Sequence, residues 1–497
     1  MAETIFRQFD FSGGVNQKQS SWLIGNNQAT AIKNITFKTP GALTKRTGQT
    51  KYNSTHIDAN PIGGLYRYYK QDGAKITLCA SGTCIYKGDD GTGTWTALEK
   101  GFQMSAFQND AFDVLVLTSN LDVNFETWKD LCFITNGTET VMKYDGVLVD
   151  NITAAPLGKY VKAHKNRLFI AGVAAYPNRL YFSDLGDETT YPVDNFIDIR
   201  TNDGDWITGL AVQGDNLVNF KNNSIYTLYG SDPDDFVLRN LYVSRGAISQ
   251  RAITNWQNIL IFASRDGVYV FDGSIITLIS EPIETEYGLL NSSNSGRAAA
   301  TIYKDCCWLS YPIGSNNYNS KVVVFDLLRK AWTIYDGIKA SVFSNWEGPG
   351  DNGNLYAGDS TDGFVWRQDS GGLDGASAIA TEYITKAYDL GIAEREKTFR
   401  RLYLFWQSSE GTIYVEALVD GVTAGQTTIG GSGEDVMIWD DGKWDEGYWG
   451  YATERVSRWD LSAAIGYRLA LKITTTGLTD TLNFYGFSLL ADVKEPR

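Results

Sequence analysis

The stretch ILIFASRDGVYVFDG at residues 259–273 decides the fold class. It opens with an apolar run of strand length, ILIFA, and a second apolar run centred on Tyr269 follows about ten residues later. The dipeptides Asp266-Gly267 and Asp272-Gly273 separate and end these runs, and Asp-Gly is typical of tight turns between antiparallel strands. The stretch therefore predicts two short strands joined by a hairpin.

This pair of runs recurs along the middle of the chain. The first runs are ITLCA (76–80), LCFIT (131–135), RLFIA (167–171), NLVNF (216–220), ILIFA (259–263) and CWLSY (307–311). The second runs centre on Tyr86, Tyr144, Tyr181, Tyr226, Tyr269 and Phe325, and a late pair is NLYAG (354–358) with FVW (364–366). Six steps cover the 280 residues from Tyr86 to Trp366, about 47 residues a step, which is typical of four-stranded propeller blades. We therefore expect an irregular β-propeller of six or seven blades over 58–372, with stacked irregular sandwiches as the alternative.

The two ends of the chain have other patterns. A small, polar, glycine-rich stretch at 370–378 marks a boundary, and beyond it the runs RLYLFW (401–406) and IYVEALV (413–419) alternate apolar with other residues. This predicts a jelly-roll-like β-sandwich over 373–497. Residues 1–57 hold only short apolar pieces between polar turns, so we expect an extended segment there that packs along its own domains or a neighbouring subunit. The whole chain is expected to be all-β.

Composition limits the possible functions. With 43% hydrophobic and 21% charged residues the chain is globular, and its net charge of −14 argues against a broad grip on nucleic acid, which needs clustered cations. Acidic charge does suit a surface that double-stranded DNA passes without sequence recognition. The N-terminus has no secretory signal and no window approaches a membrane span, so we expect assembly in a cytoplasm and no membrane crossing. Buried, reduced thiols are expected at Cys79, Cys84, Cys132, Cys306 and Cys307.

Catalytic patterns are weak. The two histidines, His56 and His164, are far apart and lack metal-ligand spacing, and the chain has no nucleophile elbow, P-loop or dinucleotide fingerprint. GDDGTGTWTAL at 88–98 is close to the Asp-box turn of sialidases, but Thr92 stands where that motif has glycine, and the box is a folding turn. Acidic loops at 231–235 and 439–447 lack EF-hand spacing. We expect a non-enzymatic protein with no catalytic residue, cofactor or metal, and keep a propeller glycosidase using two carboxylates as an alternative.

Two groups of residues are candidates for an interface or a recognition surface. Trp439, Trp444 and Trp449 lie in an Asp/Gly-rich, loop-like context, where tryptophan either stacks on sugars or packs at a contact. Arg400 and Arg401 lie among acidic neighbours, which favours an exposed strand edge or a subunit contact over a phosphate site.

Two segments carry a resemblance to a known family. The first, at 9–48, begins FSGGVN (11–16), continues through Asn34-Ile35 and ends GALTKRTG (41–48); the second is YDLGIAEREKTFRRLYL (388–404). Together they resemble the tail nozzle, or packaged-DNA stabilisation, proteins of tailed bacteriophages, which have a propeller body and a C-terminal sandwich.

The resemblance implies a structural protein of the virion tail, assembled in the host cytoplasm. Such proteins form a homo-oligomeric ring, commonly six-fold, below the portal and adaptor proteins, and its channel retains packaged DNA and releases it at infection. The blades differ too much from one another for any gate residue to be transferred. A receptor- or glycan-binding tail component remains an alternative function, with Trp444 and Trp449 as its test residues.

Overall fold

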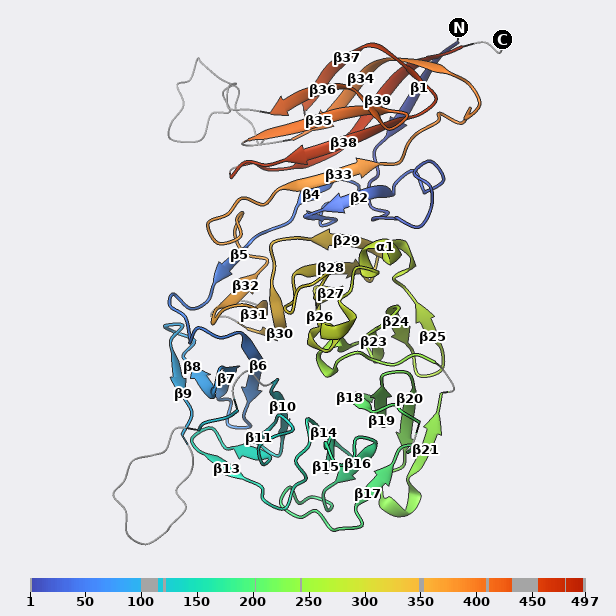
Figure 1. Cartoon of the computed structure of the whole chain (residues 1–497). Coiled ribbons are helices and arrows are strands. Elements are labelled where there is room, and N and C mark those ends of the chain that lie inside the picture. Colours follow the sequence, from blue (N-terminus) through green and yellow to red (C-terminus); the bar gives the residue numbers. More distant parts are fainter. Residues whose placement is uncertain are drawn as a thin grey trace.

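The computed structural model describes the chain as a ring of small sheets with a pair of larger sheets stacked at one end, next to both termini (Figure 1). The described residues are 2–99, 115–118, 122–201, 203–241, 244–347, 353–407, 411–430, 455–478 and 480–494. Almost all of their regular structure is β-strand.

Seven antiparallel sheets of four strands make the ring in the described part of the chain. Their first strands are β6 (Ile62–Tyr69), β10 (Asn124–Trp128), β14 (Tyr160–His164), β18 (Ile207–Gln213), β22 (Ile253–Trp256), β26 (Ala299–Tyr303) and β30 (Ala340–Trp346). The second strands are β7 (Lys75–Ser81), β11 (Leu131–Thr135), β15 (Arg167–Ala171), β19 (Asn216–Lys221), β23 (Ile259–Ser264), β27 (Cys306–Tyr311) and β31 (Asn354–Asp359). The third strands are β8 (Cys84–Gly88), β12 (Met142–Tyr144), β16 (Arg179–Phe182), β20 (Ile225–Tyr229), β24 (Gly267–Phe271), β28 (Lys321–Asp326) and β32 (Val365–Gln368). The fourth strands are β9 (Trp95–Ala97), β13 (Val149–Asn151), β17 (Phe196–Asp198), β21 (Val237–Asn240), β25 (Ile276–Leu278), β29 (Ala331–Tyr335) and β5 (Gln49–Lys51).

The ring is closed, as in a β-propeller. Each first strand contacts the first strand of the next sheet, and β30 returns to contact β6. The last blade takes its outer strand from the other end of the chain, because β5 pairs with β32 through Thr50 and Arg367. The expected propeller thus has seven blades, and the pair of runs seen in the sequence is the second and third strand of each blade.

Packing between blades explains why these runs are mostly apolar and do not alternate. Every residue of β15 is buried, and so is every residue of β19 except its first, because neighbouring blades cover both faces of the inner strands. Phe220 of β19, for example, lies 5.1 Å from Phe262 of β23 in the next blade, measured between ring centroids. A blade alone would expose these faces, so each blade depends on its neighbours.

Asp-Gly dipeptides occur in two kinds of connection. Asp145-Gly146 and Asp272-Gly273 do connect third and fourth strands within a blade. Asp336-Gly337, however, lies between β29 and β30 and links two blades, so it is not a hairpin turn. Its glycine has φ +88°, a value that any Asp-Gly turn can use, and the dipeptide alone does not distinguish the two kinds of connection.

Two larger sheets follow. One has the order β2-β33-β38-β35-β36, from β2 (Ala29–Lys33), β33 (Thr381–Thr385), β38 (Leu469–Thr475), β35 (Thr412–Val419) and β36 (Val422–Gly430). The other has the order β3-β4-β39-β34-β37, with β1 also paired to β39; its strands are β1 (Ala2–Gln8), β3 (Ile35–Thr36), β4 (Leu43–Lys45), β34 (Lys397–Trp406), β37 (Arg455–Gly466) and β39 (Asn483–Val493). The N-terminal segment therefore gives strands to both sheets and to the propeller.

In the described ranges, helical structure is confined to short turns. These are η1 (Pro233–Asp235), η2 (Gln250–Ala252), η3 (Glu281–Ile283), α1 (Glu284–Tyr287) and η4 (Ser292–Arg297). None of the helices in the described ranges has the length and apolar character needed to cross a membrane.

Candidate functional site

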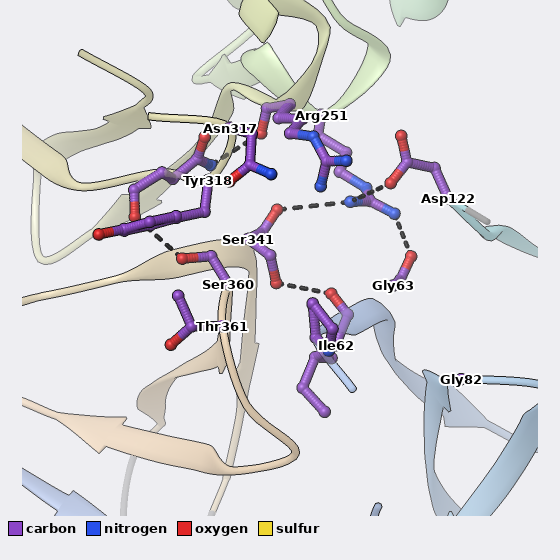
Figure 2. Close-up of a pocket in the computed structure, with 13 residues that line it drawn as sticks. Ile62, Gly63, Gly82, Asp122, Arg251, Asn317, Tyr318, Ser341, Ser360 and Thr361 are labelled. Atoms are coloured by element: carbon purple, nitrogen blue, oxygen red, sulfur yellow. Dashed lines mark hydrogen bonds and ion pairs between the residues drawn. The ribbon is translucent and has the colours of Figure 1, made fainter. Parts of the chain in front are cut away.

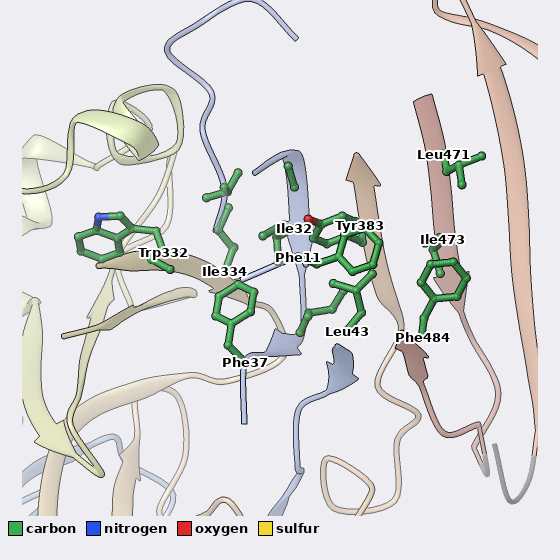
Figure 3. Close-up of a cluster of buried hydrophobic side chains, with 14 of the residues drawn as sticks. Phe11, Ile32, Phe37, Leu43, Trp332, Ile334, Tyr383, Leu471, Ile473 and Phe484 are labelled. Atoms are coloured by element: carbon green, nitrogen blue, oxygen red, sulfur yellow. The ribbon is translucent and has the colours of Figure 1, made fainter. Parts of the chain in front are cut away.

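An apolar joint connects the propeller to the two larger sheets (Figure 3). Side chains from the N-terminal segment lie in its middle, with the blade formed by β26 to β29 on one side and the larger sheets on the other. The labelled members are Phe11, Ile32, Phe37 and Leu43 from the N-terminal segment, Trp332 and Ile334 from β29, and Tyr383, Leu471, Ile473 and Phe484 from the larger sheets. Phe11 and Leu43 are fully buried here, and both belong to the 9–48 segment of the family resemblance.

Arg46, in the same segment, holds the joint by polar contacts. Its guanidinium donates to both carboxylate oxygens of Asp374, at 2.9 and 2.5 Å, and to the Asn34 side-chain oxygen at 2.9 Å. It also donates to the backbone carbonyl of Asp336 and lies over the ring of Tyr335. Because the arginine side chain is only 3% exposed, these partners replace the water that it loses.

The 388–404 segment has a buried cation of its own. Lys397 is fully buried, and its ammonium donates to the backbone carbonyls of Ile392, Arg395 and Tyr467 at 2.6, 2.8 and 3.0 Å. Burial lowers the pKa of Lys397 below its ordinary value, since a charged amine is poorly solvated there. The lysine ties the loop before β34 to the loop before β38, and this is a structural role.

Arg400 and Arg401 lie on the outer face of the sheet that contains β34. Arg400 is half exposed and pairs with Asp492 of β39. Arg401 pairs with Asp460 of β37 at 2.5 Å, and Arg458 pairs with the same carboxylate at 2.8 Å. The two predicted arginines therefore share a surface, and each is paired across strands.

Apolar residues share this face with the arginines. Ile5 is 59% exposed and Val456 57% exposed, and they flank a groove formed mainly by Phe9, Tyr403, Phe405 and Leu490. The groove has a volume of about 370 Å³. Large apolar groups exposed together are unusual on a lone soluble protein and are typical of a contact surface. We call this surface, with Arg400, Arg401 and Arg458, the outer face.

Phe9 reaches the outer face because Gly486 has no side chain. A Cβ at Gly486 would lie 2.3 Å from Cδ1 of Phe9, which is too close for any side chain. The ring of Phe9 instead lies on the strand and meets Phe405 edge-on, with the centroids 5.1 Å apart. The predicted residues Trp439, Trp444 and Trp449 lie outside the described residues.

A second candidate site lies among the first strands of the blades, which contact one another around the ring, and Figure 2 shows one of its two cavities. Two cavities of about 360 and 330 Å³ have Asp122 and Arg251 in common. Residues at or just before the starts of the first strands line both cavities, and all seven blades contribute to the lining. One lining residue from each blade, in chain order, is Ile62, Asp122, Tyr160, Thr208, Arg251, Arg297 and Ser341. We call the two together the axial cavity.

Arg251 is fixed at the centre of the axial cavity. Its guanidinium lies 3.1 Å from the Asp122 carboxylate and donates to the backbone carbonyls of Gly63 and Ser341 (Figure 2). Burial alone would raise the pKa of Asp122, but the charges of Arg251, Lys159 and Arg297 outweigh it and hold that pKa below its ordinary value. Asp122 is therefore ionised near neutral pH and unsuited to act as a general acid.

Two of the remaining groups of chemical interest are held by charged neighbours. Asp90 of the Asp-box-like turn pairs with Arg67 at 2.6 Å, and His56 contacts Asp362 at 2.5 Å. Burial and the charge of Lys165 lower the pKa of His164, which is therefore neutral at pH 7. The five cysteines are free, and burial raises the pKa of the Cys79 and Cys132 thiols. Within the described ranges, no three of the metal-ligating residue types come together as a site.

Sequence reasoning missed the axial cavity. Asp122 and Arg251 are 129 positions apart; Asp122 lies in the irregular segment before β10 and Arg251 in the short turn η2, with no motif around either. The one feature of the sequence that could have identified these two residues is their position, because both precede the first strand of a blade. Using it requires the blade boundaries, which a degenerate repeat does not give.

Comparisons with known proteins add little to this geometry. Neither a family model nor a curated protein matches the sequence. Among solved structures, the computationally designed Ika8 protein is 13% identical, with a TM-score of 0.39 over 65% of this chain and 99% of that one. YCF48 from Cyanidioschyzon merolae is also 13% identical, with a TM-score of 0.39 over 65% of this chain and 98% of that one. The extracellular domain of a putative one-component system from B. thetaiotaomicron is 11% identical, with a TM-score of 0.44 over 82% of this chain and 58% of that one.

None of these three is named as a phage tail protein, and TM-scores this low assign neither family nor function. The propeller described above follows from the strand order and contacts of this chain alone.

Proposed function

We propose that this protein is a structural component of a bacteriophage tail, the nozzle ring whose channel retains packaged DNA and releases it at infection. The observation that carries the proposal is where the residues of the resemblance lie. Phe11, Leu43 and Arg46 of the first segment are buried in the joint between propeller and larger sheets. The second segment supplies the buried Lys397 and the arginines of the outer face. Both segments thus act in the architecture and not as isolated matches.

We infer that the two larger sheets form the expected β-sandwich. Burial alternates along β34 and β35, as it does in strands with one face on a core. Apolar side chains from both sheets, such as Leu404 and Val415, belong to one buried cluster. In this arrangement the outer face lies on the side of the six-stranded sheet that points away from the sandwich core.

The outer face is where we propose that a second copy of this chain docks. It has exposed apolar side chains together with Arg7, Arg400, Arg401 and Arg458 against Glu3, Asp460 and Asp492. The whole chain has 58 acidic and 44 basic residues, so this face is less acidic than the rest. A head-to-tail contact between such a face and an acidic neighbour can close a ring. Portal and adaptor proteins are the partners expected above the ring, and DNA would pass through it without sequence recognition.

Oligomer imaging tests this proposal. We expect concentrated protein, alone or mixed with portal and adaptor proteins, to give rings with an axial pore in negative-stain images. Ile5→Glu combined with Val456→Glu should convert these rings into monomers, because it buries two carboxylates in the contact. Val193→Glu, an equally polar change at a propeller side chain that is 85% exposed, should leave the rings intact. Monomers at every concentration, with no binding to portal or adaptor proteins, would overturn the proposal.

A further inference from the structure

The axial cavity is lined by more cationic side chains than there are carboxylates to pair with them. Its charged lining residues are Lys159, Arg251, Arg265 and Arg297 against the single carboxylate of Asp122. Arg251 pairs directly with Asp122, whereas the Lys159 ammonium lies 3.9 Å from that carboxylate. Four cationic side chains around one carboxylate are unexpected in a chain of net charge −14. A cavity without a binding role would have a lining whose charge resembles that of the whole chain.

Two of these arginines make no direct ion pair through their guanidinium groups in the described part of the chain. Arg297, just before β26, lines the first cavity, and Arg265, between β23 and β24, lines the second. Both side chains are exposed, and none of the hydrogen bonds or ion pairs found among the described residues involves either guanidinium. Their five N–H donors each are therefore available to a ligand.

A buried amide gives an independent indication of a ligand. Asn222 lines the second cavity and is 92% buried, with 8% of its surface exposed. Its side-chain Nδ2 has no hydrogen-bond partner among the described residues. A buried N–H donor left unpaired is costly, by about 1–3 kcal/mol, and native proteins keep few of them. A rotation of the amide that turned Nδ2 into the cavity would let an acceptor there remove that cost.

We propose that the axial cavity binds a small ligand bearing an oxyanion, a phosphate or a carboxylate, with Arg265, Arg297 and Lys159 as its cationic contacts. Arginine matches the planar, two-oxygen edge of both groups, and the Asn222 amide and the Ser292 and Ser293 side chains at the second cavity suit the remaining oxygens. The volumes, about 360 and 330 Å³, are at the lower end of small-molecule sites. Arg251 is a positioning residue, because Asp122 and two carbonyls occupy three of its five N–H donors and fix its guanidinium. The site is independent of the proposed tail role.

Calorimetric titration of the full chain tests the site. Sodium phosphate and sodium succinate are the two probes, each compared with sodium chloride at equal ionic strength. We expect saturable binding of at least one probe, and at least a tenfold loss of affinity in the double variant Arg265→Gln/Arg297→Gln. Arg239 is an exposed arginine on β21, and the variant Arg239→Gln is the control, which should bind as the wild type does.

The two probes separate the possible sources of the oxyanion. Binding of phosphate alone supports a phosphorylated ligand, and binding of succinate alone supports a carboxylate. Both substituted arginines are exposed, so we expect the variants to fold as the wild type does. Circular dichroism of each variant checks that the propeller is folded. The proposal fails if neither probe binds more than chloride does, or if the double variant binds as tightly as the wild type.

Discussion

Single buried polar side chains decide how the parts of this molecule are held. Arg46 and Lys397 are both buried cations, and each is surrounded by oxygen atoms of the chain itself. The sequence motifs that contain them suggested a family, but the motifs could not reveal that these residues are structural. That required knowing which carbonyls face them, and those carbonyls come from segments up to 290 positions away.

Tyr383 is a buried residue whose polar group is not satisfied. It is fully buried in the joint, and its hydroxyl has no hydrogen-bond partner among the described residues. Removing an unpaired buried hydroxyl removes its desolvation cost, so Tyr383→Phe should raise the free energy of unfolding at pH 7 by about 1 kcal/mol. Tyr287→Phe is the matched control and should lower it by a similar amount, because that hydroxyl donates to the Ser264 carbonyl. Urea titration followed by tryptophan fluorescence measures both.

The same substitution has a signature in alkaline solution. Burial raises the pKa of Tyr383 well above its ordinary value, so the unfolded chain loses the phenol proton near pH 10 while the folded protein keeps it. The folded state binds more protons there, and its stability is complete below about pH 10 and falls as the pH rises further. Tyr383→Phe should therefore lose less stability than the wild type between about pH 10 and 11. Parallel losses in the two proteins would mean that Tyr383 does not contribute.

At the scale of elements, the first hairpin of several blades repeats one device. Two residues with positive φ join the first and second strands in four blades: Lys129-Asp130, Lys165-Asn166, Gln257-Asn258 and Lys304-Asp305. In three of these the second residue also accepts a hydrogen bond from the preceding blade, through Asp130, Asn258 and Asp305. The turn thus fixes the strand pair and links it to its neighbour.

These hairpins have a sequence pattern that differs from the Asp-Gly dipeptide. The Asp-Gly dipeptide predicts a turn, yet the repeated hairpins use a lysine or glutamine followed by aspartate or asparagine. Asparagine and aspartate tolerate the left-handed region, so such a pair can replace Asp-Gly without a glycine. Apolar runs predicted the second strands well because both of their faces are buried, as in β15 and β19. The first strands were missed because they lie at the axis and have mixed burial, as in β10 and β26.

Asn258 separates the two roles of this hairpin. Its φ is +69°, and its side-chain oxygen accepts from the Gly214 backbone N–H at 2.6 Å. Asn258→Gly keeps the backbone freedom and loses the hydrogen bond, at a cost of about 1 kcal/mol. Asn258→Ala loses both and should cost about 2–3 kcal/mol, because a Cβ disfavours positive φ. Thermal unfolding of the two variants and of Asn258→Asp, which keeps the oxygen, measures the difference; equal stability of the Gly and Ala variants would contradict it.

At the scale of the whole molecule, the N-terminal segment holds the two halves together. β1 pairs with β39 over seven residue pairs, β2 pairs with β33, and β5 completes the last propeller blade. Composition and repeats predicted the all-β body but not this arrangement. Short apolar pieces between turns are compatible with many partners, and pairing over more than 300 positions leaves no local pattern.

This arrangement predicts that cutting the chain between its halves will not separate them. A protease site inserted after Gly372, which is exposed and has open space around it, divides the chain between β32 and β33. The first fragment keeps β1 to β5, so its strands still pair with β33 and β39 of the second fragment, and the joint around Phe11 and Leu43 remains buried. We expect both fragments to elute together from a sizing column in native buffer and to separate only in about 6 M guanidinium chloride, which disrupts apolar burial and strand pairing.

Leu43→Asp in the same cleavable chain is the comparison, because a carboxylate at this fully buried position should weaken the joint and release the second fragment. Release of the second fragment from the unsubstituted chain in native buffer would show that the connecting segment at 370–378, and not the N-terminal strands, holds the halves together.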